Sequence, residues 1–282
     1  MKYLFRLSGL FNRLMAKIFG LQSSTSDWNV GIASLDGLGD VLFPLDSNYW
    51  IADPFLFKHK EVLYLFVEYF DKSLGRGCIG FSSYLNGNWL KFERCLIEDF
   101  HLSFPRIVKA NSDIFLTVES SSEPGVRLYK SINFPADWTL VEIIDCARRL
   151  KDPLILKDSG RFFMLASTIE SNGYAELLMY EGGESIYGSW FLSKNSPVKR
   201  RRNRIRNAGM ILDDLKLIRV SQSKLFGIYG FNVSLYEINR PISGTGFREK
   251  RIRNTYLKKP KGVAQFHTLN SLDDMIAYDY KF

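Results

Sequence analysis

Cysteine is scarce in this 282-residue sequence, which contains only Cys78, Cys95 and Cys146. The three lie far apart and in no metal-ligand spacing, so they indicate reduced, buried thiols of a cytoplasmic protein and not a disulfide framework. Long apolar runs are also absent, because no stretch approaches the roughly 18 uninterrupted apolar residues that span a bilayer. We therefore expect a cytoplasmic protein without a membrane-spanning helix.

Several signatures of catalysis are missing as well. The chain has no glycine-rich phosphate-binding loop, no Ser-His-Asp order and no His/Cys metal spacing, so we expect neither a cofactor nor a metal. What is present is a sequence 46% apolar and 24% charged, with 21 glycines and 9 prolines. This composition is ample for a well-buried core, and all-β chains of this length often form one domain.

Positive charge is concentrated in two segments. Residues 199–206 (KRRRNRIR) hold six basic residues and no acidic one, and residues 248–261 hold seven basic residues and one acidic one. The combined net charge of the two segments exceeds the net charge of the whole chain, which is +8, so the remainder of the chain is net acidic. Anionic lipid, a nucleotide-sugar diphosphate or nucleic acid could each be the partner of such patches. Nucleic acid is the least favoured, because the first run has no interleaved aromatic residues.

The N-terminal segment, residues 1–21, has apolar residues at helical spacing with four basic residues among them. The apolar positions are Leu4, Leu7, Leu10, Phe11, Leu14, Ile18 and Leu21, and the basic ones are Lys2, Arg6, Arg13 and Lys17. The four charges interrupt any signal-peptide core. We predict a short amphipathic helix that, with a polar linker, occupies residues 1–27. It would lie on an anionic membrane surface or pack against protein, and amphipathicity alone does not separate the two.

From Trp28 onward the sequence consists of short apolar runs divided by turn residues, and one unit recurs. The unit is a short motif, an apolar strand, a polar turn and an aromatic-rich strand, as in ADPFLFKHKEVLYLFVE. Its equivalent points are Pro54, Pro105, Pro153, Ala208 and His267, which are 51, 48, 55 and 59 residues apart. A period near 50 with four short strands per unit is typical of a β-propeller.

The fifth unit ends after two strands, and residues 28–33 can supply the missing part. The sequence therefore predicts an all-β, five-bladed β-propeller over residues 28–282, closed by both ends of the chain. Such closure removes the open sheet edge that would invite aggregation. A β-sandwich is the alternative, but it gives no reason for five equivalent units.

Polar residues recur where the innermost strand of each unit begins, and in a propeller these starts converge on the axis. The residues so collected are Asp53, Arg106, Asp152, Arg206, Asn207 and His267, with Tyr49 and Trp50 at the mouth of the predicted pocket. Carboxylates, guanidiniums, an amide and an aromatic face suit a polyhydroxylated or anionic sugar. Each also has a structural interpretation, since an Asp before proline often caps a turn and a histidine can be a core residue. We expect Glu68 and Glu119, which end second strands, to pair with Arg106 and Arg206.

The stretch from Trp28 to Phe282 resembles a known domain. The matching elements include Trp28-Asn29-Val30-Gly31, Trp50 to Phe55, Phe66-Val67-Glu68, Phe104-Pro105, Arg206 with Ala208-Gly209, Tyr229-Gly230 and His267-Thr268. In this order they are similar to the propeller domain at the N-terminus of plant glucosamine inositolphosphorylceramide transferases and to its bacterial relatives. More distantly, the Asp-Pro units resemble five-bladed propeller glycoside hydrolases of the arabinanase, xylosidase and invertase type.

The resemblance to the hydrolases implies roles for two residues. Asp53 matches the base or nucleophile, and Asp152 matches the aspartate that tunes a pKa. The hydrolases' general acid, a glutamate, has no counterpart, because Arg206-Asn207-Ala208-Gly209 stands in its place. Glycoside hydrolysis ordinarily needs two carboxyl groups, whereas an arginine suits a phosphate leaving group.

We therefore interpret the chain as a cytoplasmic, membrane-peripheral, glycosyltransferase-like protein of cell-surface polysaccharide or glycolipid assembly. Asp53 would activate the acceptor hydroxyl and Asp152 would orient it. Arg206, with Arg106, would bind the diphosphate of a nucleotide sugar, and His267 would bind the sugar. A non-catalytic glycan-binding propeller and a degenerate glycoside hydrolase are the alternatives.

Overall fold

The computed structural model describes residues 27–34, 41–120, 122–169, 173–188, 190–213, 216–225, 228–242, 246–256 and 263–282. Within these residues the chain consists of strands and turns. None of them forms a helix long and apolar enough to cross a membrane. The helix predicted for residues 1–21 and the linker after it lie outside the described residues.

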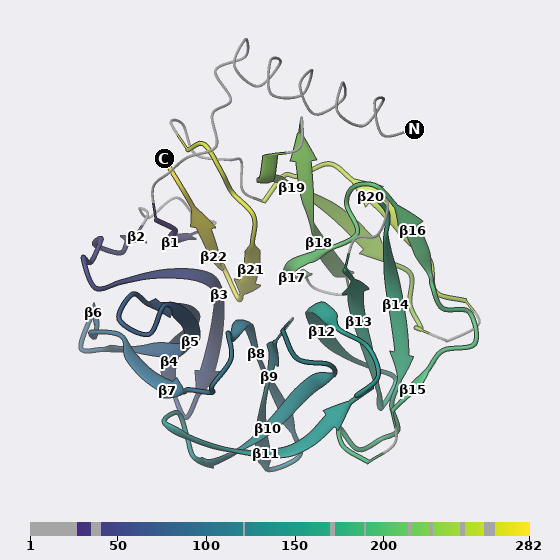
Figure 1. Cartoon of the computed structure of the whole chain (residues 1–282), viewed down its shortest axis with the longest axis horizontal. Helices are drawn as coiled ribbons and strands as arrows, with labels where there is room; N and C mark the ends of the chain where they lie inside the picture. The colour runs from purple at the N-terminus through teal and green to yellow at the C-terminus, as the bar shows by residue number, and fades with distance from the viewer. Residues whose placement is uncertain are drawn as a thin grey trace.

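The described strands form five antiparallel sheets arranged as blades around one axis (Figure 1). Blade one contains β3 (Tyr49–His59), β4 (Val62–Asp71), β5 (Arg76–Leu85), β6 (Asn88–Trp89) and β7 (Glu93–Leu96). Blade two contains β8 (Ser103–Ala110), β9 (Asp113–Glu119), β10 (Val126–Asn133) and β11 (Asp137–Ile144). Blade three contains β12 (Leu150–Asp158), β13 (Arg161–Thr168), β14 (Ala175–Glu181), β15 (Phe191–Leu192) and β16 (Lys199–Arg201). Blade four contains β17 (Asn207–Asp213), β18 (Lys216–Leu225), β19 (Ile228–Ile238) and β20 (Glu249–Ile252).

Blade five joins the two ends of the chain, in the order β2-β1-β22-β21. Its strands are β1 (Asn29–Ser34), β2 (Val41–Leu42), β21 (Leu269–Leu272) and β22 (Met275–Tyr280). Strands β1 and β22 are antiparallel in a continuous register from Asn29 opposite Tyr280 to Ser34 opposite Met275. This pairing confirms the predicted closure, and it leaves no blade with a missing inner strand.

The core is divided into clusters that lie between neighbouring blades. Leu65 and Phe66 are adjacent on β4 and point to opposite faces of the sheet, because side chains alternate along a strand. Leu65 packs with Val30 of blade five, whereas Phe66 packs with Leu116 of blade two, and all four are fully buried. Burial on both faces is why second strands such as VLYLFVE read as continuous apolar runs. The blades are therefore held together chiefly by apolar burial between sheets.

A β-bulge recurs near the start of the inner strand in blades one to four. The pairing register shifts between Ala52 and Phe55, Ser103 and Arg106, Lys151 and Leu154, and Asn207 and Gly209. The bulged residues Asp53, Phe104 and Asp152 have φ of 50°, 51° and 49°, which non-glycine residues rarely adopt. In blade four the register shift skips Ala208, and the positive φ falls at the next residue, Gly209, where a Cβ would lie 2.2 Å from the Leu269 carbonyl oxygen. In blades one to three the bulge removes one N–H from the strand ladder and frees it for another partner.

Candidate functional site

Acidic side chains from neighbouring blades accept the N–H groups that the bulges free. The Asp53 N–H donates to Asp279 at 2.9 Å, and the Asp152 N–H donates to Glu119 at 2.9 Å. The Phe104 N–H donates to Asp53 at 3.1 Å. Because an unpaired buried N–H is costly, these contacts stabilise the strained backbone and fix the acids at the axis.

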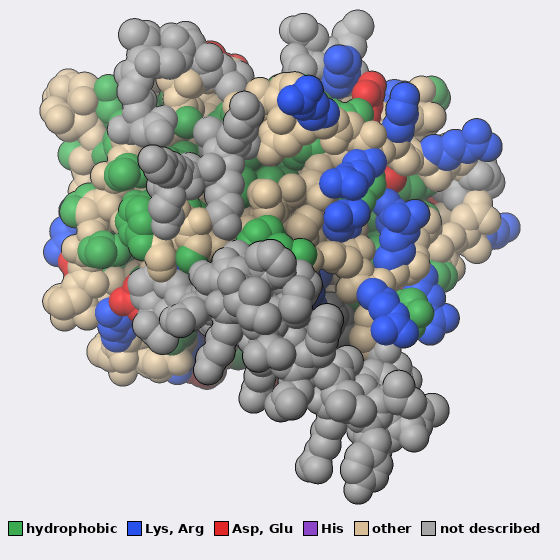
Figure 2. All heavy atoms as spheres, turned by 90° about the horizontal axis from the view of Figure 1, so that it is seen from above, with side chains coloured by type: hydrophobic (Ala, Val, Ile, Leu, Met, Phe, Trp, Pro, Cys, Tyr) green, Lys and Arg blue, Asp and Glu red, His purple; other side chains and the backbone are tan. Residues whose placement is uncertain are grey.

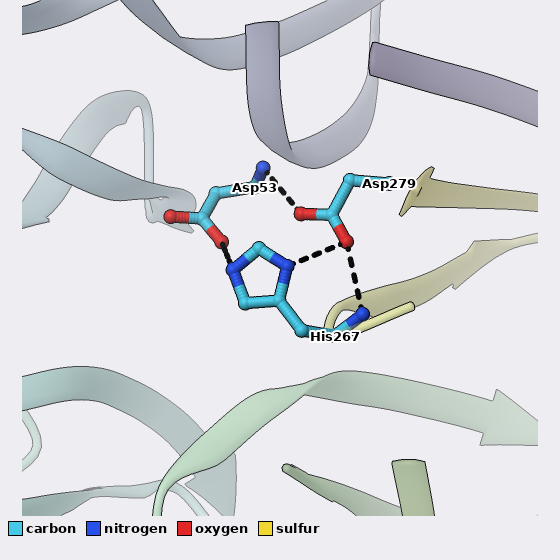
Figure 3. A group of neighbouring side chains, drawn as sticks. All are labelled: Asp53, His267 and Asp279. Carbon is cyan, nitrogen blue, oxygen red and sulfur yellow. Dashed lines mark hydrogen bonds and ion pairs between the residues drawn. The ribbon is translucent and has the colours of Figure 1, made fainter. Parts of the chain in front are cut away.

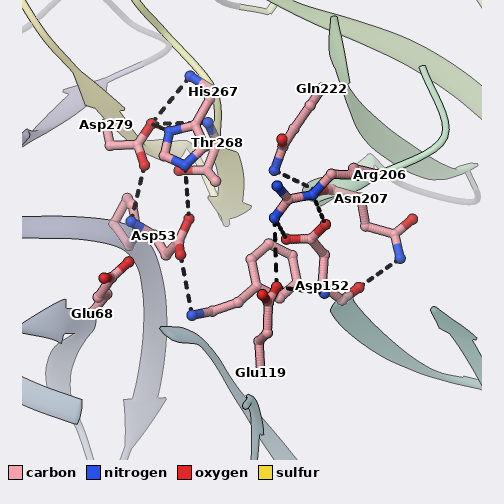
Figure 4. A network of polar contacts seen from close by, with 12 residues as sticks. Asp53, Glu68, Glu119, Asp152, Arg206, Asn207, Gln222, His267, Thr268 and Asp279 are labelled. Atoms are coloured by element: carbon pink, nitrogen blue, oxygen red, sulfur yellow. Dashed lines mark hydrogen bonds and ion pairs between the residues drawn. The ribbon is translucent and has the colours of Figure 1, made fainter. Parts of the chain in front are cut away.

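One side of the axis is built around Asp152 (Figure 4). Arg206 donates to both carboxylate oxygens of Asp152, at 2.6 and 2.7 Å, and its guanidinium lies 3.5 Å from Glu119. Asn207 donates to the main-chain carbonyls of Asp152 and Leu165. Asp152 is only 2% exposed, so this bidentate pair is well shielded from water. Both oxygens of Asp152 are thus occupied by a cation.

The other side of the axis is built around Asp53, His267 and Asp279 (Figure 3). One oxygen of Asp53 accepts the Phe104 N–H, whereas Oδ1 has no hydrogen-bond partner among the described residues. This oxygen lies 3.4 Å from His267 Nε2, and His267 Nδ1 lies 2.8 Å from Asp279. The imidazole therefore lies between two buried carboxyl groups, one fully hydrogen-bonded and one partly free.

The electrostatic setting favours protonated carboxyls at two positions. Burial raises the pKa of Asp53 well above its ordinary value, and the nearby Glu68 and Asp279 carboxylates raise it further. Burial, followed by repulsion from Asp152, raises the pKa of Glu119 to about 7 despite the opposing effect of Arg206. Asp53 consequently holds a proton more tightly than an exposed aspartate does, which makes it a stronger base once ionised.

Asp53, His267 and Asp279 are also the described residues that could hold a metal ion together. One potential ligand atom from each lies within 4.8 Å of the others, and all three residues are buried. Imidazole and carboxylate ligands suit Zn²⁺ and related cations. Asp53 lies 226 residues before Asp279, and His267 and Asp279 are 12 residues apart. The search for closely spaced His and Cys residues, which predicted no metal, does not detect such a group.

The remaining predicted residues have varied positions. Arg106 is 3% exposed, lies over the rings of Phe55 and Phe104, and donates to Asn270. Burial lowers its pKa to about 9. Glu119 faces Arg206 as expected, but Glu68 pairs with His101 at 3.2 Å and not with Arg106. The reason is positional, because Arg106 is enclosed by aromatic rings.

Two aromatic residues were predicted at the mouth of the site. Trp50 stacks on Phe70 with ring centroids 4.5 Å apart, and Tyr49 stacks on Tyr69 at 4.3 Å. Both pairs join neighbouring positions of β3 and β4, and Trp50 precedes Asp53 by three residues on the same strand. Trp50 is half-buried, and its role as a sugar platform stays a prediction.

Sequence reasoning missed several members of the network. Asp279 is the most important, because it accepts the N–H groups of Asp53, His267 and Thr268 as well as the His267 ring. A signal for it existed, since AYD in the last unit corresponds to FVE and TVE, which end with Glu68 and Glu119. Gln222 donates to the Asn207 carbonyl, and the fully buried Arg219 donates to the Asn207 side chain.

A sequence profile described as glucosamine inositolphosphorylceramide transferase 1, N-terminal, matches residues 22–272. The chain belongs to this family. Whole transferases of the same name are similar over part of their length. The Oryza sativa subsp. japonica protein is 29% identical over 208 residues, which is 70% of this chain and 28% of that protein. The Arabidopsis thaliana protein is 31% identical over 188 residues, which is 63% of this chain and 24% of that protein. The match thus spans about a quarter of these relatives.

Several glycoside hydrolases of solved structure have the same fold. A thermostable family-43 glycoside hydrolase superposes with a TM-score of 0.58 at 13% identity, covering 84% of this chain and 86% of that one. A family 117 glycoside hydrolase from Zobellia galactanivorans gives 0.56 at 10% identity, covering 73% and 70% of the two chains. An exo-β-1,3-galactanase from Phanerochaete chrysosporium, solved with galactose, gives 0.55 at 12% identity, covering 74% and 51%. At such identities the likeness shows the propeller architecture alone.

Proposed function

We propose that this chain takes part in glycosylating a glycolipid or cell-surface polysaccharide, with Asp53 as the acid–base residue of a glycosyl transfer. The observation that carries the proposal is the Oδ1 oxygen of Asp53, on a buried carboxyl at the propeller axis, which accepts no hydrogen bond from the described residues and lies 3.4 Å from His267 Nε2. Membership of a family named for a glycolipid-modifying transferase supports the substrate class. A cytoplasmic location, with residues 1–21 at an anionic membrane surface, belongs to the same proposal.

In the proposed reaction an acceptor hydroxyl reaches Asp53 Oδ1, and the ionised carboxylate takes its proton. The hydroxyl oxygen then bonds to the anomeric carbon of a nucleotide sugar as the bond to the diphosphate breaks. His267, held through Nδ1 by Asp279, lies beside Asp53 and is placed to contact the sugar. The raised pKa of Asp53 makes its ionised carboxylate a stronger base than that of an ordinary aspartate.

The contacts of Arg206 assign it a positioning task in the resting site. A diphosphate would have to compete with Asp152 for the two N–H groups that now form the bidentate pair. We therefore propose that Arg206 holds Asp152 in place. Its predicted role as a ligand of the leaving diphosphate stays a prediction, and a donor phosphate would have to approach its remaining N–H groups.

A non-catalytic glycan-binding propeller is the second candidate, and one observation favours it. Arg206 occupies both oxygens of Asp152. Asp152 therefore cannot act as the second carboxyl group of an acid–base pair with Asp53. Hydrolysis of a glycoside ordinarily needs two such groups, which makes the degenerate hydrolase the least favoured alternative. The chain also matches only about a quarter of the named transferases, so a catalytic part elsewhere in those proteins is compatible with a binding role here.

The test is to screen the full chain for release of nucleotide from nucleotide sugars, with lipid and glycan acceptors present. Asp53→Asn should keep the fold and sugar binding but lower turnover by about 10²- to 10⁴-fold, which is the usual contribution of general acid–base catalysis. Asp274→Asn, at an exposed position, is the matched control and should leave turnover unchanged. If the wild type binds glycan but releases no nucleotide from any donor, the binding module replaces the enzyme.

A further inference from the structure

A basic groove lies on the outer part of the propeller, between β16 of blade three and β20 of blade four. It has a volume of about 540 Å³. Its lining residues are Val198, Lys199, Arg201, Arg204, Tyr236, Phe247, Arg248, Glu249 and Arg251. Figure 2 shows Lys and Arg side chains gathered toward one side of the molecule with few acidic side chains among them. The axial network lies on the inner strands, so this groove is a separate feature.

The single carboxylate of the groove is already neutralised. Glu249 accepts from Arg219 at 2.7 and 2.8 Å and also pairs with Lys199. Lys199 in turn lies 3.9 Å from the centre of the Tyr236 ring. The other cations of the groove, Arg201, Arg204, Arg248 and Arg251, have no carboxylate partner among the described residues. Four guanidiniums therefore face the groove without local charge compensation.

Arg204 is held in place by a local turn. Its φ is 62°, a strained value for a non-glycine residue, and Asn203 stabilises the turn. The Asn203 side chain accepts from the N–H groups of Arg204 and Lys224 and donates to the Lys224 carbonyl. Arg204 Nε is buried yet has no hydrogen-bond partner among the described residues. Arg204 therefore lines the groove with a guanidinium in which Nε donates to none of the described residues.

We propose that this groove binds a ligand carrying two or more phosphate groups. Guanidinium N–H groups form bidentate hydrogen bonds with phosphate oxygens, and clustered arginines recognise more than one phosphate. The groove volume falls within the usual range for small-ligand sites, roughly 300 to 1,000 Å³. The phosphates could belong to a soluble diphosphate or to a phosphorylated lipid headgroup, because the recognition chemistry is the same.

The buried ion pair beneath the groove reaches toward the axis. Arg219, which is fully buried, donates to Glu249 on one side and to the Asn207 side chain at 3.1 Å on the other. Asn207 then donates to the Asp152 carbonyl at 2.7 Å. The floor of the groove and the Asp152 side of the axial network therefore share one continuous set of hydrogen bonds.

The experiment measures binding of two probes to the full chain at about 150 mM salt, where exposed charges are screened. The probes are inorganic pyrophosphate, followed by calorimetry, and phosphatidylcholine vesicles containing phosphatidylinositol bisphosphate, followed by sedimentation. Arg204→Gln with Arg251→Gln should weaken binding by about tenfold or more, since each removes a charge-assisted contact. The matched control, Lys91→Gln with Arg149→Gln, removes the same charge from exposed positions elsewhere and should change binding by less than about twofold.

Binding of pyrophosphate that depends on the groove residues assigns a soluble diphosphate, and binding of vesicles alone assigns a lipid headgroup. The proposal is overturned if neither probe binds, or if the control pair weakens binding as much as the groove pair. Should the first pair unfold the protein, Arg248→Gln with Arg251→Gln tests the same surface at two exposed side chains.

Discussion

Each side of the axial network contains an aspartate in the same backbone conformation, but the two carboxyl groups have different hydrogen-bond partners. Asp53 and Asp152 each precede a proline, occupy a bulge and have φ near 50°. Asp152 is bound at both oxygens by Arg206, whereas Asp53 keeps one oxygen without a hydrogen bond. The Asp-Pro motif therefore specifies the geometry, and the partner supplied by another blade decides whether both oxygens of the carboxyl group are bound or one is left without a hydrogen bond.

The largest effect on stability should come from breaking the pair on the Asp152 side. Arg206→Ala should lower the free energy of unfolding by about 3–5 kcal/mol, because it leaves Asp152 buried and unpaired. Urea denaturation measures the change. The double variant Asp152→Asn with Arg206→Met removes both charges and should recover much of the loss. If Arg206→Ala costs less than about 1 kcal/mol, the pair is effectively solvated and the contrast between the two sides disappears.

A smaller loss is expected on the Asp53 side from Asp279→Asn. Asp279 is fully buried and accepts three backbone N–H groups besides the His267 ring. An amide offers one oxygen and turns an NH₂ group toward the remaining donors. The free energy of unfolding should therefore fall by about 2 kcal/mol. Glu68→Gln is the matched change, because Glu68 lies on the equivalent strand, β4, but its one ion pair among the described residues is with the part-exposed His101, and it should cost less. Equal losses would mean that Asp279 does not organise the site.

The fold could be predicted because its signals are local and repeated. Turn residues and apolar runs mark each strand, and the recurrence near 50 residues counts the blades. Closure followed from a fifth unit that ended two strands early, and the β1–β22 pairing confirms it. The same geometry explains why Asp53, Asp152 and His267 lie around one axis although they are far apart in sequence.

The pairing of side chains within the site could not be predicted in the same way. Whether Arg206 meets a ligand or Asp152 depends on the direction of each side chain at a bulge, which a register shift alters. Glu249 reads in the sequence as one acid within a basic run, yet it is the buried partner of Arg219 and Lys199. Asp279 had a repeat signal, but only alignment of the last unit with FVE and TVE exposes it.

The last expected effect is a pH dependence of stability that comes from Asp53. The pKa of Asp53 is raised in the folded state, so folding favours its protonated form. Its contribution to stability is therefore full below the unfolded-state pKa, about 3.8, and is lost as the pH rises through the folded-state pKa. Asp53→Asn removes this titration, and the variant should gain stability relative to wild type as the pH increases, by about 1.4 kcal/mol for each unit by which the pKa is raised.

Urea unfolding of both proteins between about pH 4 and pH 8 measures this difference. The pKa of Glu119 is raised to about 7, so its contribution to the free energy of unfolding also falls as the pH rises. Glu119 is present in both proteins, and its contribution largely cancels when they are compared. Asp274→Asn, at an exposed site, corrects for the general effect of removing one carboxyl group. A difference that stays constant over the whole range would show that Asp53 titrates like an ordinary aspartate. The pKa of Asp53 would then not be raised by its surroundings, and the proposed acid–base role would lose its basis.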